Sequence, residues 1–193
     1  MSAIPLSLCT LVRPELAFRG DGLQFLAPRV AQTILIDTQP FSGARRLVER
    51  LDAKHIKHHW RDSFSEARNV GLEAADQDSV LILDGNERIE PKIFDRVEAL
   101  VSEGLDEGVI HCFRIDVVDN FGEVIESTYE PRLWRVSDQF RYEGRVYERL
   151  EFGDKARFVF HDEIRIIQLD EIDDPAERAA IVQRNIDLLE RQI

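Results

Sequence analysis

The stretch from His59 to Ile89 reads HWRDSFSEARNVGLEAADQDSVLILDGNERI and places a helix signal directly before a strand signal. Ser63, followed three residues later by Glu66, fits a capping box and predicts that a helix begins here. Residues 80–83 have no polar side chain, as expected for a parallel strand that is covered on both faces. The stretch therefore predicts an α/β protein in which Asp84 comes immediately after a buried strand.

The same alternation of strand and helix signals extends outward through the first half of the chain. We expect strands at residues 5–12, at 32–36 ending in Asp37, and at 55–60, and helices at 43–53 and from Pro91 onward. This order predicts a mostly parallel, Rossmann-like sheet. In open α/β sheets, ligands bind outside the carboxyl ends of the strands, where Asp37 and Asp84 are expected.

The second half of the chain has a different pattern. Residues 109–118 and 124–128 flank a turn signal at Asp119-Asn120-Phe121-Gly122, which predicts a hairpin. We expect short strands at residues 132–136, 145–150 and 157–160, and a last helix that begins at Asp174-Pro175. There is no internal repeat or clear linker, so a single domain over residues 1–193 is the economical interpretation.

Composition narrows the class of protein. With 44% hydrophobic and 32% charged residues, the 193-residue chain resembles a soluble globular protein. No apolar run approaches the roughly 20 residues that cross a bilayer, and no signal peptide is apparent. Cys9 and Cys112 lie in apolar, strand-like surroundings and are expected to be buried thiols in a reducing, cytoplasmic compartment. The net charge of −12 argues against nucleic acid as a partner.

The turn Asp84-Gly85-Asn86-Glu87 is the first candidate site. Two oxygen-bearing side chains separated by a glycine at a strand end are able to hold a hard divalent cation and, through it, a diphosphate. The alternative is a polar turn that caps the helix at Pro91. Spacing alone leaves both interpretations open.

Several further segments, in the same order along the chain, resemble glycosyltransferase family 2. The resemblance rests on these quoted segments: LSLCTLVRPE at 6–15, IDT at 36–38, WRDSFSEARN at 60–69, LDGNE at 83–87, RLWR at 132–135, YEGRVYE at 142–148 and RNIDLLE at 184–190. The family patterns that they match include V-D-T, D-D-F-S-x-A-R-N, L-D-A-D-E, R-L-F-R and F-x-G-x-V-H-E. The resemblance spans nearly the whole chain.

The resemblance implies a GT-A fold with a small antiparallel region, a nucleotide-diphosphate sugar as donor, and an inverting transfer to a glycan, lipid or protein acceptor. Residues 1–104 would then form the nucleotide-sugar-binding half, and residues 105–193 the acceptor half with the C-terminal helix. The implied donor contacts are Val12, Arg13, Asp37, Arg68 and Asp84. For Arg68, the alternative is an ion pair with Asp62 or Glu66 on the helix surface.

A divalent metal, Mn²⁺ or Mg²⁺, is also implied. Asp84 and Asn86 occupy the family's D-x-D positions, and His161 falls where a third metal contact is often placed. An ordinary strand histidine is the alternative for His161. Glu148 matches the Glu of V-H-E and is the candidate base, with Glu87 as the second candidate.

Three departures from the family pattern support a second hypothesis. V-D-T continues here as Gln39-Pro40-Phe41-Ser42, D-x-D has become Asp84-Gly85-Asn86, and V-H-E has become Val146-Tyr147-Glu148. An Asn at position 86 weakens a metal site, because it does not cancel the charge of the cation. The alternative function is therefore a catalytically silent GT-A-like domain that binds a nucleotide sugar or a partner protein. Both hypotheses require Asp37, Asp84 and Glu148 to meet in one cleft.

Overall fold

The computed structural model describes residues 3–12, 21–38, 44–137, 139–154, 156–169 and 174–192. Its strands are β1 (Ile4–Val12), β2 (Val30–Asp37), β3 (Lys54–Lys57), β4 (Ser79–Ile82), β5 (Glu87–Ile89), β6 (Val109–Val118), β7 (Val124–Arg135), β8 (Arg141–Glu143), β9 (Arg149–Glu151) and β10 (Arg157–Leu169). Its helices are α1 (Asp21–Leu26), a 3₁₀ turn at Ala27–Arg29, α2 (Ala44–Leu51), α3 (Phe64–Ala74), α4 (Pro91–Glu103) and α5 (Pro175–Glu190).

Eight of the strands form one sheet in the order β3-β2-β1-β4-β7-β6-β10-β5, and β8 pairs with β9 in a small antiparallel sheet. The first four strands are parallel, and β6 is parallel to β10. The strand β7 runs antiparallel to both of its neighbours, β4 and β6. The predicted class, a mostly parallel α/β sheet with a small antiparallel region, is confirmed.

The sheet has a hydrophobic core on each face because side chains alternate along every strand. The α4-side core consists of buried residues that include Leu8, Leu81 and Leu83 of the sheet region, Leu47 of α2, and Phe94 and Val97 of α4. The α3-side core includes Cys9, Val80 and Ile82 of the sheet, Phe64 and Ala67 of α3, Tyr142 of β8, Leu150 of β9 and Leu188 of α5. Both cysteines are buried free thiols, as expected.

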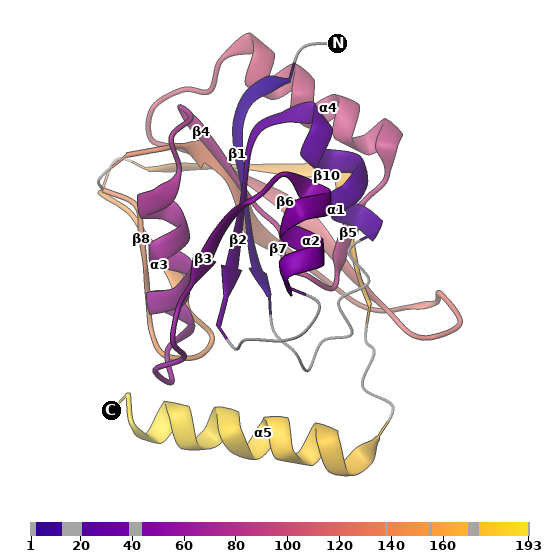
Figure 1. Ribbon diagram of the computed structural model, residues 1–193, viewed down its shortest axis with the longest axis vertical. Coiled ribbons are helices and arrows are strands. Elements are labelled where there is room, and N and C mark those ends of the chain that lie inside the picture. Colours follow the sequence, from indigo (N-terminus) through magenta and orange to yellow (C-terminus); the bar gives the residue numbers. More distant parts are fainter. Residues whose placement is uncertain are drawn as a thin grey trace.

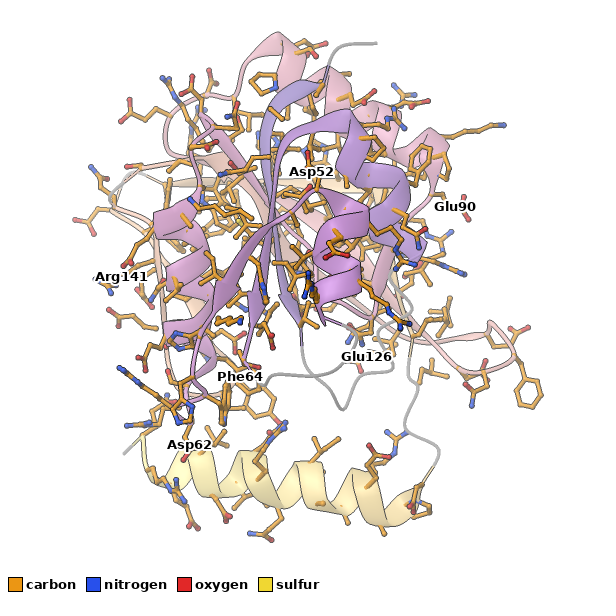
Figure 2. The ribbon with its side chains drawn as sticks, viewed as in Figure 1. Asp52, Asp62, Phe64, Glu90, Glu126 and Arg141 are labelled. Atoms are coloured by element: carbon orange, nitrogen blue, oxygen red, sulfur yellow. The ribbon has the colours of Figure 1, made fainter. Side chains whose placement is uncertain are left out.

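The helix α5 lies across the end of the molecule toward which β1 and β2 point (Figure 1). Figure 2 shows Asp62 and Phe64 at the end of the body nearest this helix. Arg191 pairs with Asp62 at 2.6 Å, and Leu188 is buried against the α3-side core. Within the ranges given above, no helix combines the length and the apolar character needed to span a membrane.

Several expected boundaries in the second half are wrong. The expected strands at residues 124–128 and 132–136 are parts of the single strand β7, which pairs with β6 along most of its length. Of the strand expected at 145–150, only residues 149 and 150 lie in a strand, β9, since a loop at 144–148 separates β8 from β9. The strand expected at 157–160 continues to Leu169 because it pairs with β6. The short elements α1 and β5 were not predicted.

Candidate functional site

The helix α3 carries the central residue of the site. Its N-cap is Ser63, whose hydroxyl accepts a hydrogen bond from the Glu66 backbone N–H at 3.3 Å. The Glu66 carboxylate pairs with Arg61 at 3.0 Å rather than closing the second half of a capping box. The helix therefore begins where the sequence predicts, and this start sets the direction in which Arg68 points.

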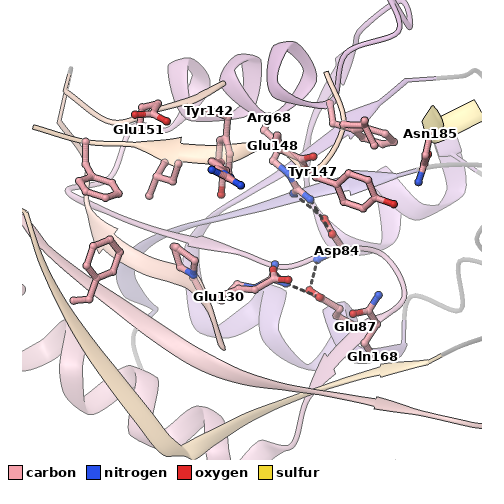
Figure 3. A pocket seen from close by; sticks show the side chains of 18 of the residues that line it. Arg68, Asp84, Glu87, Glu130, Tyr142, Tyr147, Glu148, Glu151, Gln168 and Asn185 are labelled. Atoms are coloured by element: carbon pink, nitrogen blue, oxygen red, sulfur yellow. Dashed lines mark hydrogen bonds and ion pairs between the residues drawn. The ribbon is translucent and has the colours of Figure 1, made fainter. Parts of the chain in front are cut away.

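Arg68 joins the two carboxylates that the sequence singled out. Its Nη1 and Nη2 donate to the two oxygens of Asp84, each at 2.9 Å, and its Nε donates to Glu148 Oε1 at 2.5 Å. Figure 3 shows the three side chains pointing toward one another in the cavity. The guanidinium also lies 5.5 Å from the centre of the Tyr142 ring. The alternative for Arg68, an ion pair with Asp62 or Glu66, is therefore not what the structure shows.

The charge balance of this trio has a clear direction. Burial alone would lower the pKa of the Arg68 guanidinium, but the charges of Asp84 and Glu148 outweigh it and hold the pKa well above its ordinary value. Two carboxylates share one cation, so the trio carries a net negative charge. Removing the cation would take a charge partner away from each of two largely buried carboxylates.

A strained loop positions Glu148. Gly144 has a φ of 97°, and Tyr147, which precedes Glu148, has a φ of 52°. A positive φ is unusual for a residue other than glycine and recurs at functional sites. The loop is fixed to α3 by the Phe64 backbone N–H, which donates to the Arg145 carbonyl at 2.8 Å.

Glu87, the second candidate base, has a structural role. Its Oε1 accepts from Arg132 at 2.6 Å, and its Oε2 accepts from the Asp84 backbone N–H at 2.8 Å. Burial raises the pKa of Glu87 to about 7, despite the opposing charge of Arg132. With both oxygens engaged, Glu87 fixes the turn that presents Asp84, whereas Glu148 bonds Arg68 through one oxygen.

Arg132 is a cavity-lining residue to which sequence reasoning gave no role. It is buried and lies between Glu87 and Glu130, which it contacts at 2.6 and 2.8 Å. The available signal was a cation within the otherwise apolar segment Pro131-Arg132-Leu133-Trp134. A buried cation on a central strand requires a buried acid, and Glu87 supplies it.

These residues line a cavity of about 880 Å³. Its walls come from α3, the turn after β4, strand β7, the β8–β9 region, β10 and helix α5; the charged and amide residues labelled there are Arg68, Asp84, Glu87, Glu130, Glu148, Glu151, Gln168 and Asn185 (Figure 3). Tyr142 and Tyr147 add aromatic surface. The cavity therefore combines a charged floor with an apolar wall, as ligand sites commonly do.

Asp37 is not brought to this cavity. It ends β2, two strands from β4 in the sheet, but the preceding residue Ile36 belongs to the α3-side core, so the alternation turns Asp37 toward the opposite face. There it contacts His55 at 3.2 Å. Val12 ends β1 beside Asp37 and is buried, while Arg13 lies outside the described residues. The expected meeting of three carboxylates holds for Asp84 and Glu148 alone.

The predicted metal ligands do not form a set. The carboxylate of Asp84 is held by Arg68, and the Asn86 amide donates to the Leu169 carbonyl at 3.3 Å. His161 is opposite Phe113, a residue of the α4-side core, in the register of β10 and β6, and the two rings make an edge-to-face contact. Its Nε2 also lies 2.9 Å from His111 Nδ1. It therefore lies on the face of the sheet opposite to the cavity. Within the described part of the chain, no three His, Cys, Asp or Glu side chains gather to hold a metal ion.

Comparisons with known proteins agree on the fold. No family model matches the chain. A TPR repeat-containing protein of Synechococcus elongatus is 32% identical over 83 residues, which are 43% of this chain and 21% of that protein. S. aureus TarS 1–349 in complex with UDP-GlcNAc superposes with a TM-score of 0.62 at 14% identity and covers 88% of this chain and 59% of its own.

A second solved structure, GalNAc-T7 with UDP, GalNAc and Mn²⁺, superposes with a TM-score of 0.61 at 12% identity and covers 89% of this chain and 45% of its own. This chain thus spans about a fifth of the curated relative and about half of the two solved neighbours. Together with the sheet order and the helices on both faces, these likenesses show that the chain has the GT-A fold.

Proposed function

We propose that this chain binds a nucleotide-diphosphate sugar at the carboxyl edge of its sheet and transfers the sugar to an acceptor hydroxyl with inversion. The observation that carries the proposal is the bridge from Arg68 to Asp84 and Glu148 on the wall of an 880 Å³ cavity. The fold supports it, because the solved neighbours that share the fold hold UDP or UDP-GlcNAc. A cavity of this volume lies within the range that small ligands occupy.

In this proposal the acceptor hydroxyl gives its proton to Glu148 while its oxygen forms a bond to the anomeric carbon of the sugar. The bond from that carbon to the diphosphate oxygen breaks, and its electron pair leaves with the nucleoside diphosphate. Arg68 holds Glu148 through Oε1 and so orients Oε2 for the acceptor. Asp84 would contact the sugar. Val12 and Asp37 are buried, and Asp37 faces away from the cavity, so neither is assigned a side-chain contact to the donor here.

A second candidate function is a catalytically silent domain that binds a nucleotide sugar or a partner protein. The observation in its favour is that Arg68 Nε already occupies Oε1 of Glu148, the candidate base itself, at 2.5 Å.

One experiment distinguishes the two candidate functions. It compares three proteins: the parent, the variant Glu148→Gln and the control variant Glu143→Gln. Glu143 lies exposed on β8 and does not line the cavity. Calorimetry measures the binding of UDP-GlcNAc and of the corresponding ADP, GDP and dTDP sugars, and NMR follows slow release of free sugar and its anomeric configuration.

For an active transferase, we expect Glu148→Gln to lower turnover about 10²–10⁴-fold with little change in donor affinity, and Glu143→Gln to match the parent. Binding by the parent with no turnover supports the silent domain instead. If the parent binds none of these nucleotide sugars, the proposed transferase is wrong. Retention of the donor's anomeric configuration in the product would contradict inversion.

A further inference from the structure

The cavity contains buried cations that are already neutralised. Arg68 lies between Asp84 and Glu148. Arg132 likewise lies between two carboxylates, those of Glu87 and Glu130, which also line the cavity. Each guanidinium is thus matched by two acids, and neither offers uncompensated positive charge to a diphosphate. A diphosphate that entered this cavity would meet a surplus of carboxylates unless another cation faced it.

Arg184 of α5 is such a cation. It lines the same cavity and is half-buried. Its Nε and Nη2 donate to the Asn185 side-chain oxygen at 3.3 and 3.2 Å, and its guanidinium lies 5.7 Å from the centre of the Phe64 ring. No carboxylate of the described residues pairs with it. Arg149 also lines the cavity but is exposed to solvent.

The position of Arg184 is close to the charged end of the cavity. Phe64, which it contacts, and Arg68 are four residues apart on α3 and so lie on one face, one turn from each other. Figure 3 shows the neighbouring residue Asn185 at the end of the cavity where Tyr147, Glu148 and Asp84 lie. The helix thus presents a cation and an amide to the same space as the bridged carboxylates.

The helix is anchored beyond this point, which fixes where Arg184 lies. Arg191 pairs with Asp62 at 2.6 Å, the Gln192 side-chain oxygen accepts from the Arg145 backbone N–H at 2.7 Å, and Leu188 is buried. A cation on an anchored helix costs less entropy to bring to a ligand than one on a mobile segment.

We infer that Arg184, oriented by Asn185, binds the diphosphate of the donor and neutralises the charge that develops on the departing nucleoside diphosphate. This inference rests on the proposed function. It assigns to a guanidinium the charge compensation that the predicted metal ligands are not arranged to provide. Guanidinium suits this role because its N–H groups match two phosphate oxygens at once.

The test measures the binding of UDP, GDP, ADP and CDP by calorimetry in a buffer that contains EDTA. The proteins compared are the parent, Arg184→Gln, Arg184→Lys and Arg191→Gln. Arg191 is the C-cap residue of the same helix and lies outside the cavity, so its variant controls for looser packing of α5. The parent nucleoside without phosphate, for example uridine, controls for recognition of the base.

We expect Arg184→Gln to weaken binding of the diphosphate about 10-fold or more and to leave the affinity for the nucleoside unchanged. Arg184→Lys should lose less, and Arg191→Gln should stay within about threefold of the parent. Equal affinities of parent and Arg184→Gln, or binding by the parent only when Mn²⁺ is added, overturn this inference and leave the proposed function standing. If the parent binds no nucleoside diphosphate, both are wrong.

Discussion

Two charged clusters in this chain combine guanidiniums and carboxylates in opposite ratios. In the cavity, one guanidinium, that of Arg68, lies between two carboxylates. At the other cluster, one fully buried carboxylate, that of Asp116, accepts from Arg114 Nε at 2.7 Å and from Arg165 Nε at 2.7 Å. The Ser127 hydroxyl donates to it at 2.6 Å.

The difference lies in how the sheet builds each cluster. Arg114 and Asp116 are two residues apart on β6, Ser127 is opposite Asp116 on β7, and Arg165 is opposite Arg114 on β10. Strand register alone makes this cluster, and its acid is fully satisfied. The cavity trio instead comes from a helix, a strand end and a loop, with an excess of acid. We therefore interpret the Asp116 cluster as structural and the Arg68 trio as part of the proposed ligand site.

The largest effect is expected from Arg68→Met. Loss of the shared cation removes a charge partner from two largely buried carboxylates, which should lower the free energy of unfolding by about 3–5 kcal/mol. Binding of nucleoside diphosphates should weaken, because a diphosphate in the cavity would then meet Asp84 and Glu148 without the cation that lies between them. Urea unfolding and calorimetry measure the two effects, and Arg68→Lys, which keeps the charge but not the fork, should recover part of the stability. If Arg68→Met bound nucleotides as the parent does, the Arg68 trio would be structural, like the Asp116 cluster, and the contrast between the two would be wrong.

A smaller loss, confined to stability, is expected from Asp116→Asn. Burial would raise the pKa of the Asp116 carboxyl, but the Ser127 hydroxyl and the guanidiniums of Arg165 and Arg114 hold the pKa below its ordinary value. The stabilisation is therefore present above the unfolded pKa of about 3.9 and is lost as the pH falls through the lower folded value.

At pH 7 we expect Asp116→Asn to reduce the free energy of unfolding by about 2 kcal/mol. The gap from the parent should narrow as the pH falls through the lowered folded pKa of Asp116, since below it both chains carry a neutral side chain. Nucleotide affinity should be unaffected. Unfolding curves at pH 7 and at successively more acidic pH test the stability, and a fall in nucleotide affinity would show that the two clusters are coupled.

The smallest effect is expected from Ser63→Ala, which removes the N-cap of the helix that carries Arg68. The change should cost about 1 kcal/mol. Because the Arg68 contacts lie beyond the first turn, nucleotide affinity should stay within about threefold. Thermal unfolding and calorimetry measure both. Ser65→Ala, one residue into α3, is the matched control, and a large loss of affinity in Ser63→Ala alone would show that the site depends on the helix start.

Local signals predicted the first half of the chain well. The capping signal at Ser63 and the apolar residues before Asp84 place α3 and β4 correctly, because both depend on near neighbours. The second half depends on pairing between distant strands. The loop at residues 144–148 contains Val146, Tyr147 and Glu148 in what resembles a strand pattern, but the positive φ of Gly144 and Tyr147 interrupts it.

The candidate site was predicted only in part, because its contacts also join residues that are distant in the sequence. The strand-end rule located Asp84, and the family resemblance named Glu148 and Arg68, but neither shows that one guanidinium contacts both acids across 16 and 80 residues of sequence. The side to which Asp37 and His161 point follows from the alternation along β2 and β10, which needs the register of the sheet. The cytoplasmic location and the absence of nucleic acid partners stay predictions.

The contact between β4 and β7 divides the eight-stranded sheet into two sets of four strands. Only three residue pairs, Ser79 with Arg135, Val80 with Trp134 and Leu81 with Leu133, are registered between the two described strands. The cavity straddles this seam, with Asp84 on one side and Arg132 on the other. A molecule that contacted both walls would tie the halves together and slow amide hydrogen exchange at residues 133–135. Occupancy of the cavity would then raise the cooperativity with which the whole sheet unfolds.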